Sequence, residues 1–79
     1  METTPDATLD CLGLYCPMPI LQTAAQIARL APGQVLEVLS DDPGILNDMP
    51  AWCETTGHEF LGWSQQGREY RVYVRKRSA

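Results

Sequence analysis

Histidine and cysteine, on which many catalytic and metal sites depend, are scarce in this sequence. It contains one histidine, His58, and three cysteines, none of which form a Cys-x-x-Cys pair. A structural zinc site needs four regularly spaced ligands, and a disulfide-bonded secreted miniprotein needs a denser, even set of cysteines. We therefore expect reduced thiols and no metal site.

Targeting and membrane-spanning patterns are also missing. Residues 1–10 are acidic, without the basic start and apolar stretch of a signal peptide, and no apolar run is long enough to span a bilayer. Of the 79 residues, 44% are apolar, which is typical of a folded globular chain. We expect a single cytoplasmic, monomeric domain over residues 1–79, with an ordered core at about residues 7–76.

Basic residues are nearly absent from the first 67 positions, where Arg29 stands alone against nine acidic residues. A chain whose bulk is acidic repels nucleic acid. The other five bases follow Gly67, so the last predicted strand could attract an anionic partner through Arg71, Arg75 and Lys76. The alternative interpretation is a solvated edge strand whose charges prevent aggregation.

Hydrophobic periodicity and turn residues divide the chain into six elements. Ile20, Ala24 and Ile27 recur at helical spacing, and Pro32-Gly33 ends that helix. The predicted elements are a strand at 7–12, a helix at 16–30, a strand at 35–40, a helix that Asp48 caps and Gly57 ends, and strands at 58–64 and 69–75 joined by a turn at 65–68.

This order, β-α-β-α-β-β, predicts an α+β two-layer sandwich in which two helices pack on one face of a four-stranded mixed sheet. In the last strand, Tyr70, Val72 and Val74 alternate with residues that include Arg71 and Arg75, so one face is apolar and the other basic. The uncovered face of the sheet must then meet solvent or a partner.

The run Cys16-Pro17-Met18-Pro19 places a cysteine at the start of the first predicted helix. The first N–H groups of a helix lack partners and carry partial positive charge, which stabilises a thiolate. If Cys16 is the N-cap, Pro19 offers no N–H and the direct donor to the sulfur is Met18 N–H. We then expect the pKa of the thiol to fall below its free value of about 8.5. Gly13 allows a tight turn before the helix.

Nothing near Cys16 in the sequence completes a hydrolase or redox site. No histidine lies close to it, and no second cysteine follows at i+3. A lone, activated thiol suits a carrier that accepts a group, such as sulfane sulfur, and hands it on. The alternative is a small structural residue at a helix start. Cys11 and Cys53 are predicted to lie in the core.

Several other polar and aromatic residues have both structural and functional interpretations. Asp10 and the pair Asp41-Asp42 could line the rim of the site, although turn and capping roles explain them better. His58 is expected to satisfy the end of the second helix or to hold the hairpin rather than to act in catalysis. Trp52 and Trp63 are typical of core or face-covering residues.

The run Cys16-Pro17-x-Pro19 occurs together with Leu9-Asp10, Asp41-Asp42-Pro43 and Asp48-Met49-Pro50, and with this set the chain resembles the TusA/SirA family of small sulfur-carrier proteins from Leu9 to Lys76. The resemblance implies the two-layer fold, a persulfide on Cys16, and no cofactor or metal. It also implies a cysteine desulfurase or rhodanese as sulfur donor and an acceptor protein that leads to tRNA thiolation, molybdenum cofactor assembly or sulfur oxidation. The motifs that carry it, in this order and spacing, are Leu9-Asp10, Gly13-Leu14, Cys16-Pro17-x-Pro19, Pro32-Gly33, Asp41-Asp42-Pro43, Asp48-Met49-Pro50 and Gly57-His58.

The chain departs from this family on the first helix, and two other functions stay open beside sulfur transfer. Members often carry lysine or arginine after the motif, where this chain has Gln22-Thr23-Ala24-Ala25. One alternative is a regulatory or assembly module that binds through the sheet face, with Cys16 structural. The other is an RNA-binding domain that uses the basic last strand, although the acidic remainder and the single phenylalanine, Phe60, argue against it.

Overall fold

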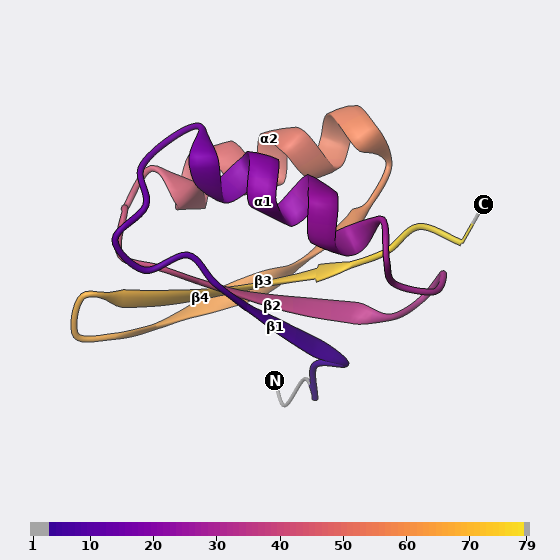
Figure 1. Cartoon of the computed structure of the whole chain (residues 1–79), viewed down its shortest axis with the longest axis horizontal. Helices are drawn as coiled ribbons and strands as arrows, with labels where there is room; N and C mark the ends of the chain where they lie inside the picture. The colour runs from indigo at the N-terminus through magenta and orange to yellow at the C-terminus, as the bar shows by residue number, and fades with distance from the viewer. Residues whose placement is uncertain (1–3, 79) are drawn as a thin grey trace.

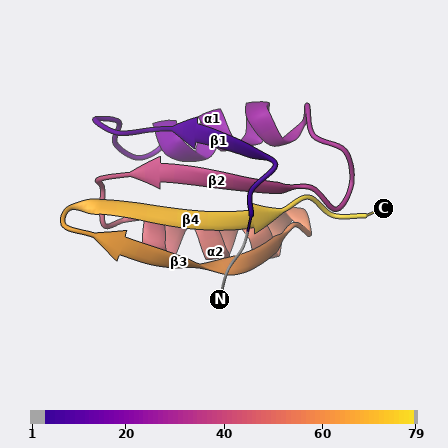
Figure 2. The same cartoon turned by 90° about the horizontal axis from the view of Figure 1, so that it is seen from below.

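Two helices cover one face of a four-stranded sheet and leave the other face open. The computed structural model describes residues 4–78, and Figures 1 and 2 show the two layers from the side and from the open face. No helix within those residues is long and apolar enough to cross a membrane. The elements are β1 (Ala7–Asp10), α1 (Met18–Ile27), β2 (Val35–Ser40), α2 (Ile45–Thr56), β3 (Glu59–Gln66) and β4 (Glu69–Arg75).

The strands lie in the order β1-β2-β4-β3, so the sheet is mixed, as predicted. β1 pairs with β2 in parallel, with Ala7 opposite Leu36, and the helix α1 forms the crossover that a parallel pair requires. β4 pairs antiparallel with both β2 and β3. Between β1, at the edge of the sheet, and β2, the chain crosses the helical face as α1.

The core lies between the helices and the two central strands. β2 and β4 supply side chains with no exposed surface, and α2 packs Ile45 and Met49 against them. Cys11 and Cys53 are both buried in this core, which confirms their predicted positions. The fully buried apolar residues of the strands are Leu36, Val38, Val72 and Val74.

The helix α1 is shorter than the predicted span of 16–30, and its buried face is different. It begins at Met18 with Pro17 as N-cap, and it loosens after Ile27, where Leu30 N–H donates to the carbonyl of Ile27 at 3.1 Å. Its buried positions are Pro19, Thr23 and Ile27. A polar residue can occupy this face because the Thr23 hydroxyl donates to the Pro19 carbonyl at 2.7 Å.

The helix α2 begins three residues before Asp48, so the prediction that Asp48 caps it is wrong. The chain already turns at Asp42, whose Oδ1 accepts a hydrogen bond from Gly44 N–H at 3.0 Å, and Gly44 becomes the N-cap. Asp48 instead lies in the first turn, where a carboxylate complements the helix dipole. Pro50 therefore lies inside the helix and not at its start, and Gly57 ends it as predicted, with φ of 86°.

The strand ends also differ from the predicted boundaries. β1 stops at Asp10 and not at residue 12, because the Asp10 side chain accepts a hydrogen bond from Leu12 N–H and turns the chain. β3 runs to Gln66, beyond the predicted end at Ser64. The β3–β4 turn is consequently only two residues long, and Gly67 takes a φ of 59° at its first position, the pattern of a type II′ hairpin turn.

The open face of the sheet is polar, and its side chains bind one another. Glu37 accepts hydrogen bonds from the Thr8 hydroxyl at 3.0 Å and the Tyr73 hydroxyl at 2.8 Å. Arg75 pairs with Glu59 at 3.1 Å on the neighbouring strand. The structure agrees with the prediction that one face of β4 is apolar and buried. The other face carries the predicted Arg71 and Arg75, but glutamates pair with both, so it is mixed in charge and not basic.

Candidate functional site

Cys16 is the only exposed cysteine of the three. It lies in the loop that joins β1 to α1, above the end of the sheet where β2 leads into α2 (Figure 1). Gly13 takes a φ of 80° in this loop, the left-handed conformation that favours glycine, and this confirms the predicted tight turn. The fold therefore presents one thiol to solvent and keeps the other two buried.

Three carboxylates hold the Cys16 loop through its backbone. Two of them, Asp41 and Asp42, belong to the β2–α2 turn, so they tie this turn to a loop nearly thirty residues earlier in the chain. Asp10 acts within its own segment. These are the turn and capping roles expected for the three residues. The contacts are Leu12 N–H to Asp10 at 2.9 Å, Gly13 N–H to Asp41 at 3.1 Å and Cys16 N–H to Asp42 at 3.3 Å.

Cys16 does not cap the helix, which corrects the predicted contacts of its sulfur. The N-cap is Pro17, one residue later, and Pro19 lies at the second helical position. Met18 N–H, the expected donor to the sulfur, donates to the carbonyl of Tyr15 at 2.8 Å. The two prolines and this turn hold the backbone on both sides of the thiol.

The charges around the thiol oppose the predicted fall in its pKa, and that prediction is wrong. Asp48, on the first turn of α2, raises the pKa of Cys16, first because its carboxylate can accept a hydrogen bond from the protonated thiol and second through its negative charge. Asp42 adds a weaker effect in the same direction. Because Cys16 precedes the N-cap, the helix start does not outweigh these neighbouring carboxylates.

Four large apolar side chains are exposed on the segment that carries Cys16. They are Leu12, Tyr15, Met18 and Leu21, which we call the apolar collar, and Tyr15 is 71% exposed. Apart from Trp63, they are all the exposed large hydrophobic residues that the described chain has. The collar was not predicted from the sequence, because the buried face of α1 runs along Pro19 and Thr23 and not along the predicted Ile20 and Ala24.

The three predicted partner contacts do not form one surface. Arg71 pairs with Glu69 at 2.8 Å, and Arg75 pairs with Glu59 on the open sheet face. Lys76 lies on the helical side, where its Nζ donates to the carbonyl of Leu30 at 2.6 Å. A lysine in that place satisfies helix-end carbonyls.

His58 and the two tryptophans have structural contacts. The Nδ1 atom of His58 accepts a hydrogen bond from Arg77 N–H at 3.1 Å, and its ring lies 5.2 Å from that of Trp52. Burial lowers the pKa of His58, and the charges of Arg77 and Lys76 lower it further. Trp63 lies opposite buried Val72, so it covers the edge of the helical face. Residues 4–78 contain no cluster of three His, Cys, Asp or Glu side chains that could hold a metal.

A comparison with known protein families identifies the family of this chain. The model of the family described as sulfurtransferase TusA matches residues 7–76. The chain belongs to the TusA family. The sulfur carrier protein TusA of Pseudomonas entomophila is 40% identical over 73 residues, which cover 92% of this chain and 91% of that protein. Membership of the TusA family supports a sulfur-carrier role.

A solved structure shares the TusA-family fold at low sequence identity. It is a SirA-like protein from Desulfitobacterium hafniense, with a TM-score of 0.79 over 90% of this chain and 97% of that one, at 23% identity. The fold prediction is thereby confirmed.

The four neutral residues that follow the motif on α1 differ in their exposure. Of the four neutral residues that follow the motif, Thr23 is fully buried, so a charged side chain at that position would not face a partner. Gln22 and Ala25 are exposed and neutral.

Proposed function

We propose that Cys16 carries sulfane sulfur as a persulfide between a donor protein and an acceptor protein. The observation that supports this most is the placement of the one exposed thiol of a TusA-family chain on a loop whose backbone is held by Asp41 and Asp42. A carrier needs such a sulfur, fixed in position and open on one side. A reducing compartment such as the cytoplasm would keep it available.

The transfer step is a substitution at sulfur. The Cys16 thiol gives up its proton, and the carboxylate of Asp48 beside it can accept that proton. The sulfur then attacks the outer sulfur of the donor's persulfide, the donor S–S bond breaks, and the donor thiolate leaves with the electron pair. The proton returns to the donor thiolate, so the charges balance. Delivery repeats the same substitution, with a nucleophile of the acceptor attacking the outer sulfur on Cys16.

The apolar collar supports a protein as donor and as acceptor. Exposed hydrophobic residues that gather beside a reactive group are typical of a protein–protein contact. Tyr15 and Leu21 are more than half exposed and lie on opposite sides of Cys16 in sequence. A cysteine desulfurase or a rhodanese fits the donor role, and the acceptor determines whether sulfur enters tRNA, a cofactor or an oxidation route.

The open sheet face gives less support to the alternative functions. A module that binds through this face, or an RNA-binding strand, would use Arg71 and Arg75, and both are already paired with glutamates. Glu37 adds negative charge at the centre of the face and is occupied by Tyr73. Because these charged side chains are paired with one another, the open face is better explained as a solvent-facing surface than as a binding site.

The proposal is tested by loading the protein with a cysteine desulfurase and cysteine, followed by intact-mass and peptide analysis. We expect the mass of one added sulfur atom on the peptide that contains Cys16, removed by a reducing agent. Cys16→Ser should abolish the gain, whereas Cys53→Ala should retain it because Cys53 is buried.

The donor must be varied before the result is interpreted, because a cysteine desulfurase and a rhodanese both fit the proposed donor role. A rhodanese with thiosulfate provides the second arm. Loading of Cys16→Ser to the same extent as the unmodified chain would disprove the proposal, as would a lack of transfer from Cys16 persulfide, prepared chemically, to every acceptor thiol offered.

A further inference from the structure

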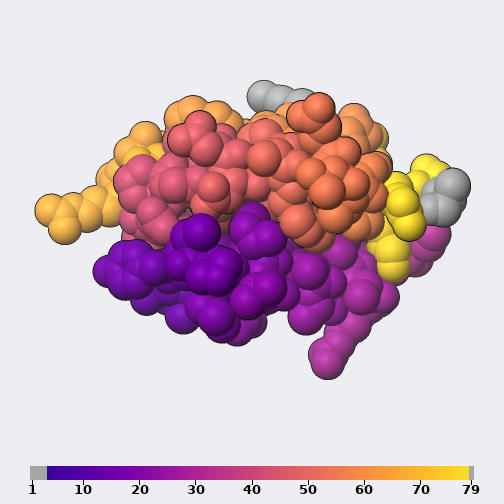
Figure 3. Space-filling model, turned by 90° about the horizontal axis from the view of Figure 1, so that it is seen from above, coloured from indigo at the N-terminus to yellow at the C-terminus, as the bar shows by residue number. Residues whose placement is uncertain are grey.

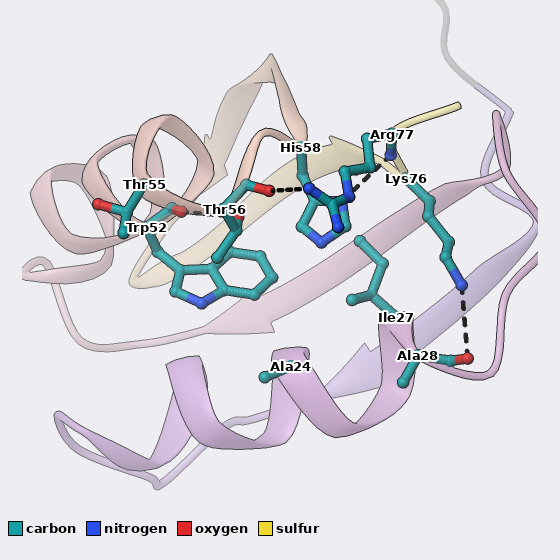
Figure 4. A pocket seen from close by; sticks show the side chains of 9 residues that line it. All are labelled: Ala24, Ile27, Ala28, Trp52, Thr55, Thr56, His58, Lys76 and Arg77. Atoms are coloured by element: carbon teal, nitrogen blue, oxygen red, sulfur yellow. Dashed lines mark hydrogen bonds between the residues drawn. The ribbon is translucent and has the colours of Figure 1, made fainter. Parts of the chain in front are cut away.

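A groove opens between the two helices at the end of the molecule opposite Cys16. α1 is ten residues long, about 15 Å, and the groove lies beside its last turns. Its volume is about 550 Å³, within the range of small-molecule sites. Figure 3 shows α1 and α2 side by side on this face, and Figure 4 shows the groove from close by. It is lined by Ala24, Ile27, Ala28, Trp52, Thr55, Thr56, His58, Lys76 and Arg77.

The helical walls of the groove are apolar and partly aromatic. Ala24 and Ala28 lie on the α1 side, and their small side chains leave room opposite the indole ring of Trp52 (Figure 4). The ring of His58 lies next to that indole, with centroids 5.2 Å apart and planes inclined by 31°. A flat aromatic group fits such a wall better than a branched aliphatic one, because it can stack on two neighbouring rings.

The far end of the groove is cationic. Lys76 donates to the carbonyls of Ala28 and Leu30, and Arg77 Nη1 donates to the carbonyl of Thr56 at 3.2 Å. These contacts use two of the three donors of the lysine and one of the five of the guanidinium. No carboxylate of residues 4–78 forms an ion pair with either side chain.

We propose that this groove binds a small aromatic carboxylate, with its ring between Ala28 and Trp52 and its carboxylate on Arg77 and Lys76. An anion there meets two positive charges in a chain that is otherwise acidic, and charge-assisted hydrogen bonds to a guanidinium are strong. The site shares no residue with the Cys16 loop or the apolar collar. The proposal is therefore independent of sulfur transfer.

The test uses 2-naphthoate as probe and the uncharged 2-naphthamide as its comparison, followed by amide and side-chain NMR shifts of the full chain. We expect saturable shifts at Ala28, Trp52, Thr56 and His58, with a dissociation constant of about 1 mM or below. The amide should bind about tenfold more weakly, because it lacks the charge that Arg77 and Lys76 recognise.

Matched substitutions separate this site from nonspecific binding. Ala28→Leu should fill the groove and abolish the shifts, whereas Ala25→Leu, on an exposed position of the same helix outside the lining, should leave them unchanged. Arg77→Gln should weaken naphthoate binding about tenfold, whereas Arg68→Gln, in the hairpin turn, should not. Equal binding of acid and amide, or shifts centred on the apolar collar, would overturn the proposal.

Discussion

The sulfur of Cys16 lies between a helix start and two carboxylates, and these act on its charge in opposite directions. The helix dipole favours a thiolate, but the thiol precedes the N-cap, and the carboxylate of Asp48 favours its protonated form. The carboxylates of Asp48 and Asp42 raise the pKa of Cys16, so the unpartnered protein keeps the thiol protonated near neutral pH. A protonated thiol oxidises slowly, which protects a carrier between transfers.

Replacing Asp48 by asparagine should make Cys16 more reactive. The substitution removes the charge and weakens the hydrogen bond that raise the thiol pKa, so a larger fraction is thiolate at pH 7. We expect iodoacetamide to alkylate the variant several-fold faster than the unmodified protein. The alkylation rate of both proteins should rise with pH. The rate of Asp48→Asn should reach its plateau at a lower pH than that of the unmodified protein, because its thiol pKa is lower.

Glu54→Gln is the control for this prediction, because Glu54 is an exposed carboxylate on the same helix and is not among the groups that shift the thiol pKa. It should leave the alkylation rate unchanged. Equal alkylation rates for Asp48→Asn and the unmodified protein would show that the Asp48 carboxylate does not raise the pKa of the Cys16 thiol.

The sequence singled out the cysteine that the structure exposes, but it did not indicate the surroundings of that cysteine. Cys16 stands out because two prolines follow it and the other cysteines lie in apolar patterns. Asp48 is more than thirty residues away, and only the packing of α2 against the β1–α1 loop brings its carboxylate to the sulfur. Local pattern reasoning therefore gave the wrong direction for the pKa.

At the scale of elements, the β2–α2 turn organises both the start of a helix and the loop that carries the thiol. One carboxylate of Asp42 accepts from Gly44 N–H with Oδ1 and from Cys16 N–H with Oδ2. The pattern predicted α2 from Asp48 because a capping residue stands before Pro50. The turn of Asp42 starts the helix earlier, so Pro50 lies inside the helix.

Replacing Asp42 by alanine should loosen the loop and the helix together. The variant loses two hydrogen bonds of a half-buried carboxylate, and we expect the free energy of unfolding to fall by about 1–2 kcal/mol. Urea unfolding measures that loss, and hydrogen exchange should show faster exchange of the Cys16 amide.

Asp10→Ala serves as the comparison, because Asp10 accepts a single hydrogen bond, from Leu12 N–H within its own segment. It should cost less stability and leave the exchange rate of the Cys16 amide unchanged. If the Cys16 amide of Asp42→Ala exchanged as slowly as that of the unmodified protein, Asp42 would not anchor the loop.

At the scale of the whole molecule, the buried thiols connect stability to pH. Burial raises the pKa of Cys53 from 9.0 to about 11, and burial also raises the pKa of Cys11. The folded protein thus holds these protons more tightly than the unfolded chain. This contribution to stability is fully present below pH 9 and is lost as the pH rises through about 11.

We therefore expect the free energy of unfolding to decline between pH 9 and 11, by up to about 2 kcal/mol from Cys53. Urea unfolding at several pH values measures the decline. Cys53→Ala should be less stable at pH 8 but flatter over this range, because it has no thiol to titrate. The same slope in both proteins would assign the decline to other groups.

The architecture was predictable because each strand and helix of this chain has a clear pattern and the connections are short. The alternation of Tyr70, Val72 and Val74 indicated which face of β4 is buried, and the structure agrees. What the pattern lacked was long-range information: the sheet order, the pairing of Arg75 with Glu59 and the exposure of Leu21 all depend on neighbours distant in sequence.

The Cys16 loop is anchored through backbone N–H groups, and this bears on how the partner specificity of such a chain can change. Leu12, Gly13 and Cys16 donate to carboxylates through the main chain, so the side chains at positions 12, 15 and 18 take no part in holding the loop. They can be exchanged without moving the sulfur. If Cys16 carries sulfur as proposed, a different set of side chains at these three positions would change which protein receives it, while the backbone anchors stay the same.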